Sequence, residues 1–179
     1  MSRVNDLKVV GIELQKKYVR LAVRNAAFNG FNAEIVECDI TEVPAAYKKI
    51  GYNHVVLNPP FFESNSSTQS DHYDKNMAKR ELGKTLDDWL NVAIKRCAPK
   101  GEVVILHKAG RLSQILKVFD GRLGDIKILP ISSFEGRPAK RIIVKGKKGS
   151  ASPLKILAPF IMHKISGEER LAKNYTDAA

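Results

Sequence analysis

The chain has 179 residues with 44% hydrophobic and 27% charged content, which is ordinary for a soluble globular protein. Its formal net charge of +11 favours a polyanionic partner such as nucleic acid, although basic proteins without such a partner are common. The two cysteines, Cys38 and Cys97, lie far apart and indicate neither a zinc site nor a disulfide framework, so a reduced, cytoplasmic setting is expected. No signal peptide, lipidation signal or membrane-length apolar span is recognisable, and the four histidines lack metal-ligand spacing.

Short apolar runs alternate with stretches of helical periodicity, a pattern typical of an α/β protein with a mostly parallel sheet. In the first third of the chain, residues 9–12, 34–40 and 54–58 are predicted to be strands. A helix is predicted between the first two strands, and Asn29-Gly30 supplies its stop signal. The alternation predicts that the carboxyl ends of these strands meet at one edge of a sheet.

The rest of the chain continues the alternation after a polar loop. Its predicted elements are, in order, a helix capped by Thr85 over residues 86–97, a turn at 99–101, a strand over 103–106, a helix over 112–119, and two closing strands over 127–131 and 141–145 that form a hairpin. One domain is expected over residues 1–165, followed by a C-terminal tail over 166–179.

The segment Asn58-Pro59-Pro60-Phe61 follows the third predicted strand and is the most informative part of the sequence. Prolines cannot continue a sheet ladder, so the strand must end here. The Asn58 amide, the Pro59 carbonyl and the Phe61 ring are then presented together at the carboxyl end of a strand, where open α/β sheets bind ligands. These groups suit an exocyclic amino group beside a planar ring. The alternative is a turn that only ends the strand.

The order of strand, acidic residue, helix, strand, aspartate, strand and Asn-Pro-Pro-Phe resembles the class I S-adenosylmethionine-dependent methyltransferases. Within them, the chain is similar to the bacterial tRNA-valine adenine-N6 methyltransferases, which modify the adenine beside the anticodon. The similarity runs over nearly the whole chain and is carried by residues 10–14, 24–27, 29–30, 58–62, 85–90, 111–112 and 138–141. It implies a Rossmann-like sheet, mostly parallel with a C-terminal antiparallel hairpin, with S-adenosylmethionine as cofactor and tRNA as partner.

One departure from the family pattern concerns the glycine-rich turn that wraps the methionine part of the cofactor. The chain has no such GxGxG-like segment, and its first residues resemble the end of the first helix of the fold. The first strand and helix are therefore expected to be missing, and in the family that strand lies between the strands that end at Glu13 and Asn58. A catalytically inactive fragment or an RNA-binding remnant is one alternative that follows from this departure.

The resemblance also implies roles for individual residues. Asn58 and Pro59 would hold the amino group of the target base, Pro60 would complete the motif, and Phe61 would stack on the base. Glu13 would accept hydrogen bonds from the ribose hydroxyls of the cofactor, beside Leu14. The residues expected to border the cofactor adenine are Cys38, Asp39 and Ile40, with Asp39 as acceptor from its amino group and Asn58 as a further cofactor contact. A helix-terminus acid for Glu13 and a turn-forming role for Asp39 are the structural alternatives.

Two questions about the substrate stay open at the level of sequence. Ribosomal-RNA guanine-N2 and glutamine methyltransferases use a similar motif, although the glutamine enzymes usually carry tyrosine where this chain has Phe61. A basic segment near the C-terminus favours RNA and could contact its backbone; it comprises Arg137, Lys140, Arg141, Lys145, Lys147 and Lys148. A solvated basic hairpin is the alternative. The sequence does not indicate an oligomeric state.

Overall fold

The computed structural model describes residues 7–60 and 84–163, and all structural statements below concern these residues. They separate into two compact units that divide between Ile50 and Gly51. Each unit is described by itself.

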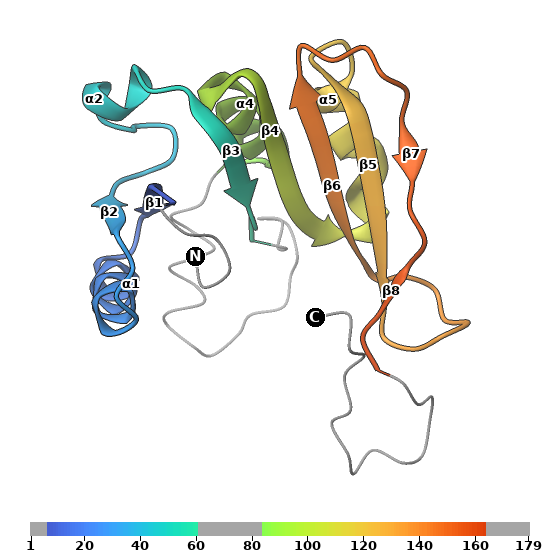
Figure 1. Cartoon of the computed structure of the whole chain (residues 1–179), viewed down its shortest axis with the longest axis horizontal. Coiled ribbons are helices and arrows are strands. Elements are labelled where there is room, and N and C mark those ends of the chain that lie inside the picture. The colour runs from blue at the N-terminus through green and yellow to red at the C-terminus, as the bar shows by residue number, and fades with distance from the viewer. Residues whose placement is uncertain (1–6, 61–83, 164–179) are drawn as a thin grey trace. The chain divides into compact units, whose positions relative to one another are not determined.

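The first unit is a parallel β-α-β arrangement (Figure 1). Strand β1 (Val9–Glu13) pairs with β2 (Ala33–Glu37), from Val9 opposite Ala33 to Glu13 opposite Glu37. Helix α1 (Lys16–Phe28) connects the two strands, and the predicted stop is confirmed because Gly30 adopts a φ of 66° that favours glycine. A short helix that was not predicted, α2 (Ala45–Lys48), follows β2.

The second unit is built on a six-stranded sheet in the order β3-β4-β6-β5-β7, with β8 also paired to β5. Its elements are β3 (Tyr52–Leu57), α4 (Leu86–Arg96), β4 (Cys97–Lys108), a 3-10 turn (Ala109–Arg111), α5 (Leu112–Phe119), β5 (Leu123–Ser132), β6 (Arg141–Lys148), β7 (Lys155–Ile156) and β8 (Phe160–Ile161). Strands β3 and β4 are parallel, whereas β6 runs antiparallel to both β4 and β5. The predicted α/β class, mostly parallel with a C-terminal antiparallel hairpin, is confirmed.

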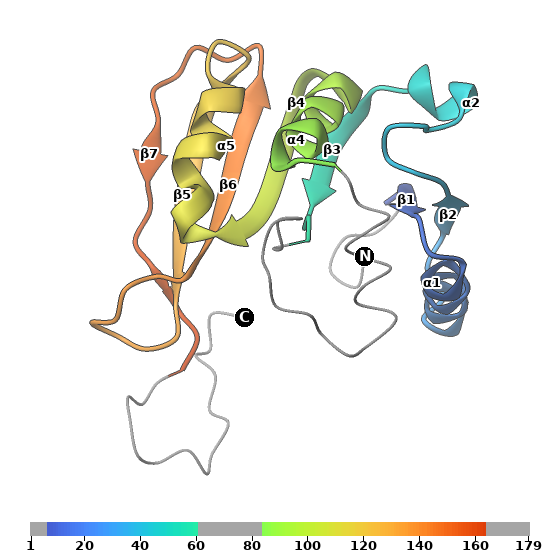
Figure 2. The ribbon, with the colours of Figure 1, turned by 180° about the vertical axis from the view of Figure 1, so that it is seen from behind.

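The core of this unit lies between one face of the sheet and the helices α4 and α5, which cover that face together (Figure 2). Its fully buried side chains come from both helices and from the two central strands; they are Leu90, Ile115, Phe119, Val103, Ile105 and Val144. The alternation of buried and half-buried residues along β4 turns Val103 and Ile105 toward the helices. Burial of these large apolar groups is the main stabilising contribution to the unit.

Helix α4 begins as the sequence predicts. The Thr85 hydroxyl accepts a hydrogen bond from the Asp88 amide, and the Asp88 carboxylate accepts one from the Thr85 amide in return, which forms a capping box. At its other end, the Lys148 ammonium donates to the carbonyls of Ile94 and Cys97 at 2.9 and 2.8 Å. These two carbonyls have no helical partner, so Lys148 satisfies them and also carries positive charge to the negative end of the helix dipole.

Several predicted boundaries differ from the structure, and two of the differences are informative. The turn predicted at 99–101 is part of β4, where Lys100 adopts a φ of 64°. The register moves from Tyr52–Cys97 to His54–Glu102, so the extra residues form an irregularity within the strand. Gly101 is needed there, because a Cβ would lie 2.9 Å from the Asn53 carbonyl oxygen. The strand predicted over 34–40 ends earlier, at Glu37.

Candidate active site

The carboxyl end of β3 presents the asparagine of the predicted motif. Leu57, the last residue of the strand, is buried and lies opposite Ile105 of β4. Asn58 is exposed, Pro59 is buried and Pro60 is exposed. The buried Pro59 ring anchors the chain as it leaves the sheet, so the Asn58 side chain stands at the surface directly after the strand. Phe61 lies outside the described residues.

In the first unit, Glu13 occupies the carboxyl end of β1. Its Oε1 atom accepts a hydrogen bond of 2.9 Å from the Gln15 amide, and its backbone carbonyl accepts one of 3.1 Å from the Cys38 amide. The second bond joins the end of β1 to the residue that follows β2. The structure thereby brings Glu13 and Leu14 to the same edge as Cys38 and Asp39, as the parallel pairing predicts.

Asp39 forms an Asx turn. Its Oδ1 atom accepts hydrogen bonds of 2.7 Å from both the amide and the hydroxyl of Thr41, and its carbonyl accepts one from the Glu42 amide. The carboxylate is therefore held in a fixed orientation two residues beyond the end of β2. This geometry agrees with the turn-forming role, and the role as acceptor from the cofactor adenine stays a prediction.

The remaining predicted cofactor residues, Leu14, Cys38 and Ile40, are half-buried. Burial raises the pKa of the Cys38 thiol, and the charge of Asp39 raises it further. A thiol held in its neutral form is a poor nucleophile, so Cys38 suits apolar contact with a planar ring better than covalent chemistry.

The predicted site residues thus fall into two sets. Glu13, Leu14, Cys38, Asp39 and Ile40 come together at the carboxyl end of β1 and β2 in the first unit. Asn58, Pro59 and Pro60 lie at the carboxyl end of β3 in the second unit. The first set offers carboxylates, which can accept hydrogen bonds from a ribose diol or an exocyclic amine. The second offers an amide and a backbone carbonyl.

His107, a residue that the sequence reasoning did not assign to the site, lies at the same end of the second unit. It stands two positions after Ile105, which pairs with the last residue of β3, and only 4% of it is exposed. Burial lowers its pKa, and the positive charges of Arg111 and Lys108 lower it further, which favours the neutral imidazole. The one signal in the sequence that could have pointed to His107 is its alternation with Val103 and Ile105, which places all three on the buried face of β4.

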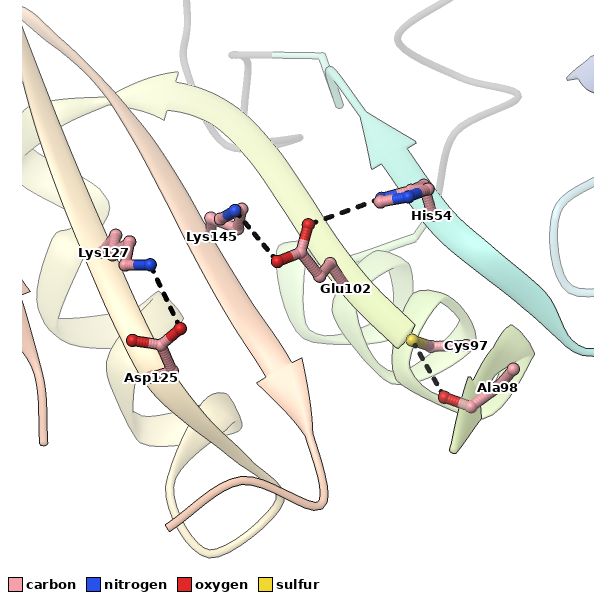
Figure 3. A network of polar contacts seen from close by, with 7 residues as sticks. All are labelled: His54, Cys97, Ala98, Glu102, Asp125, Lys127 and Lys145. Atoms are coloured by element: carbon pink, nitrogen blue, oxygen red, sulfur yellow. Dashed lines mark hydrogen bonds and ion pairs between the residues drawn. The ribbon is translucent and has the colours of Figure 1, made fainter. Parts of the chain in front are cut away.

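Two lysines of the predicted RNA-contacting segment have partners within the protein. Lys145 donates to Glu102 at 2.9 Å, and Glu102 also lies 3.4 Å from His54, which links β3, β4 and β6 across the open face of the sheet (Figure 3). Lys148 is the α4 cap described above. Lys145 and Lys148 therefore have structural roles. The members of the segment that stay candidates for contact with the RNA backbone are Arg137, Lys140, Arg141 and Lys147.

Neither a metal site nor a membrane span is found in the described ranges. No group of three or more histidine, cysteine, aspartate or glutamate side chains there could hold a metal ion. None of the helices in residues 7–60 and 84–163 is long and apolar enough to cross a bilayer.

Comparisons with solved structures show similar folds. A predicted O-methyltransferase from Agrobacterium tumefaciens is 24% identical, with a TM-score of 0.72 over 98% of this chain and 76% of that one. The N-methyltransferase NodS from Bradyrhizobium japonicum, in complex with S-adenosyl-L-homocysteine, is 10% identical with a TM-score of 0.54 over 80% and 67%. A tRNA methyltransferase from Aquifex aeolicus is 13% identical with a TM-score of 0.52 over 80% and 54%. At these identities the likeness concerns the fold.

Among sequences, no curated protein matches the chain. The family described as N-6 DNA Methylase does match, over residues 2–120, which is more than half of the 179 residues. The chain therefore belongs to the N-6 DNA methylase family and is a methyltransferase that uses S-adenosylmethionine.

Proposed function

We propose that this protein methylates the N6 amino group of an adenine in tRNA, with S-adenosylmethionine as the methyl donor. The observation that carries the proposal is the end of β3, where the exposed Asn58 is followed directly by the buried Pro59. This arrangement offers an amide oxygen and a backbone carbonyl oxygen within one dipeptide. The two acceptors suit the two hydrogens of an exocyclic amine.

The N6 amine of adenine is a poor nucleophile because its lone pair is delocalised into the ring. The Asn58 side-chain oxygen and the Pro59 carbonyl would each accept one N6 hydrogen, which favours a tetrahedral nitrogen with its lone pair free. S-adenosylmethionine supplies an electrophilic methyl group bound to a sulfonium. The new N–C bond forms as the C–S bond breaks, its electron pair remains on sulfur, and the nitrogen loses a proton to water. Positioning of this kind contributes several kcal/mol to lowering the barrier.

The first unit fits the adenosine half of the donor. Glu13 stands at the carboxyl end of β1, and a carboxylate there can accept hydrogen bonds from both ribose hydroxyls. Asp39 and the half-buried Cys38 and Ile40 follow β2 at the same edge. In open parallel sheets this edge is where nucleotide-like ligands bind, which supports the assignment.

The choice of tRNA rests on the sequence resemblance and on charge. The net charge of +11 favours a nucleic-acid substrate, and one protein of similar fold is a tRNA methyltransferase from Aquifex aeolicus. Because the matching family is named for DNA methylation, duplex DNA is the alternative substrate that must be tested beside tRNA.

The direct test is to incubate the protein with S-adenosylmethionine and either unmodified tRNA or duplex DNA, and to identify modified nucleosides by mass spectrometry. The proposal predicts N6-methyladenosine in tRNA alone. N6-methyladenine in DNA would support the proposed chemistry but show that the substrate is DNA. N2-methylguanosine in RNA would show that the target base is guanine and not adenine. Folded protein that modifies none of these nucleic acids would contradict the proposal.

A further inference from the structure

Four basic residues stand at the same end of the second unit as Asn58, and we call them the basic rim: Lys108, Arg137, Lys140 and Arg141. Strands β3 and β4 are parallel, so the end of β4 at Lys108 lies at the edge that carries Asn58. Strand β6 runs the other way, and Arg141, its first residue, lies directly opposite Lys108. The loop between β5 and β6 therefore projects at this edge (Figure 1). All four side chains are exposed.

This loop is held in place at several points. The Ala109 amide donates to the Lys140 carbonyl at 3.0 Å, and the Arg137 amide donates to the Phe134 carbonyl at 3.3 Å. The Phe134 ring contacts the His163 ring, with centroids 5.2 Å apart. Gly136 allows the turn between Phe134 and Arg137, because it adopts a φ of 69° that favours glycine. The basic side chains are thus presented by a fixed backbone, which lowers the entropic cost of binding a ligand there.

The charges of the rim are arranged differently from those elsewhere in the sheet. Like charges directly opposite on neighbouring strands are unfavourable. Lys127 and Lys145 are such a pair, and there each ammonium has a carboxylate, Asp125 at 3.1 Å and Glu102 at 2.9 Å (Figure 3). Lys108 and Arg141 are also opposite each other, yet no ion pair of Arg141 occurs within the described residues. An external anion at the rim would relieve this repulsion.

Among the described residues, two acidic groups near this edge are engaged within the protein. Asp88 is engaged in the capping box of α4, and Asp87 accepts a hydrogen bond of 2.8 Å from the Gln114 amide group. Both lie on the helix-covered side of the sheet. Glu135 is the one acidic residue in the segment 133–140 that joins β5 to β6, and three basic residues of the rim lie within the six positions after it.

We propose that the basic rim binds the phosphate backbone of a single-stranded nucleic-acid segment next to the base that enters the Asn58 site. The inference rests on the proposed function for the identity of that base. Phosphate contacts fix the register of a bound strand without reading its sequence. Contacts on one side of the target would therefore place the adenine at Asn58 in the right orientation, while Asn58 and Pro59 select the amino group.

The test measures binding of a fluorescent RNA hairpin with adenines in its unpaired loop, across a range of salt concentrations. The test variant is Arg137→Gln/Lys140→Gln/Arg141→Gln. A matched control, Lys95→Gln/Lys100→Gln/Lys117→Gln, removes the same charge from exposed positions at the opposite end of the same unit. For the test variant we expect weaker binding and a log–log salt slope flatter by about 2, because each lost phosphate contact on a single strand contributes about 0.7. The control should change the slope by much less.

The outcomes separate this inference from the proposed function. Tight binding by the wild type with an equal loss in both variants would overturn the inference and leave the methylation chemistry intact. A test variant that binds as the wild type does would overturn it as well. If the wild type itself fails to bind RNA, the assignment of an RNA substrate fails together with the rim. Methylation of the hairpin should fall in parallel with binding, while affinity for S-adenosylhomocysteine stays unchanged.

Discussion

Asn58 is the residue on which the proposed chemistry depends most. Replacement of Asn58 by alanine removes the side-chain acceptor that would hold the amine in its reactive geometry. We expect methyl transfer to fall by about 100-fold or more, the loss typical when one transition-state hydrogen bond is removed. Affinity for S-adenosylhomocysteine should be spared. Single-turnover methylation and calorimetry measure the two effects.

The control for this substitution is Asn53→Ala, which removes an exposed asparagine from the same strand. Undiminished methylation by Asn58→Ala would contradict the role assigned to the amide. Equal losses in both variants would point to damage to β3 instead.

At the residue scale, the sequence located side chains at strand ends better than it identified their partners. Asn58 could be placed at a strand end because two prolines follow an apolar run. Lys145 and Lys148 could not be separated from the rest of the basic segment. Their partners Glu102 and Ile94 lie 43 and 54 positions away, and no local pattern reveals such contacts.

Helix α4 depends on interactions at both of its ends, and the cap at its C-terminal end comes from β6. We expect Lys148→Met to lower the free energy of unfolding by about 1–2 kcal/mol, because the substitution leaves the carbonyls of Ile94 and Cys97 without their charged donor. Chemical denaturation measures the change. Lys147→Met, at the neighbouring position, is the matched control, and we expect it to lower the free energy of unfolding much less. Weakened RNA binding with unchanged stability would contradict this structural role for Lys148.

The pairing of β3, β4 and β6 should depend on pH through Glu102. The hydrogen bond from Lys145 holds the pKa of this carboxyl below its ordinary value of 4.5, and the charges of Lys145, His54 and Lys147 lower it further. A depressed folded pKa means that the ion pair stabilises the protein fully above the ordinary value. We therefore expect this contribution to be lost as the pH falls below 4.5 and through the folded pKa.

Unfolding measured across the acidic range, with the Glu102→Gln variant beside the wild type, tests this dependence. The variant should be less stable at neutral pH and should lose less stability on acidification. Glu135→Gln removes an exposed carboxylate and is the control. A Glu102→Gln variant with the same acid dependence as the wild type would contradict the assignment.

At the scale of elements, the longer helices were the more predictable part. The apolar positions of α4 and α5 recur at helical spacing, and Thr85 marks the start of α4. The sequence predicts a turn at the irregularity in β4 because proline and glycine, here Pro99 and Gly101, are common in turns. Strands β7 and β8 contain two residues each, which is too few to show a periodicity in the sequence.

At the scale of the whole molecule, the residues proposed to bind the cofactor and those proposed to bind the target base belong to separate units, which divide between Ile50 and Gly51. Sequence order predicted that both sets follow strands, and the structure places them at the carboxyl ends of parallel-paired strands, while their roles stay predictions. The proposed function requires that the chain hold its methyl donor through residues such as Glu13 and Asp39.

Calorimetric titration of the 179-residue chain with S-adenosylhomocysteine tests this requirement most directly. The account predicts binding in the micromolar range, weakened by Glu13→Gln and unaffected by Glu42→Gln, an exposed acid in the same unit. A chain that is folded by circular dichroism and gives no binding heat at several temperatures would contradict the claim that these residues form a working methyl-donor site.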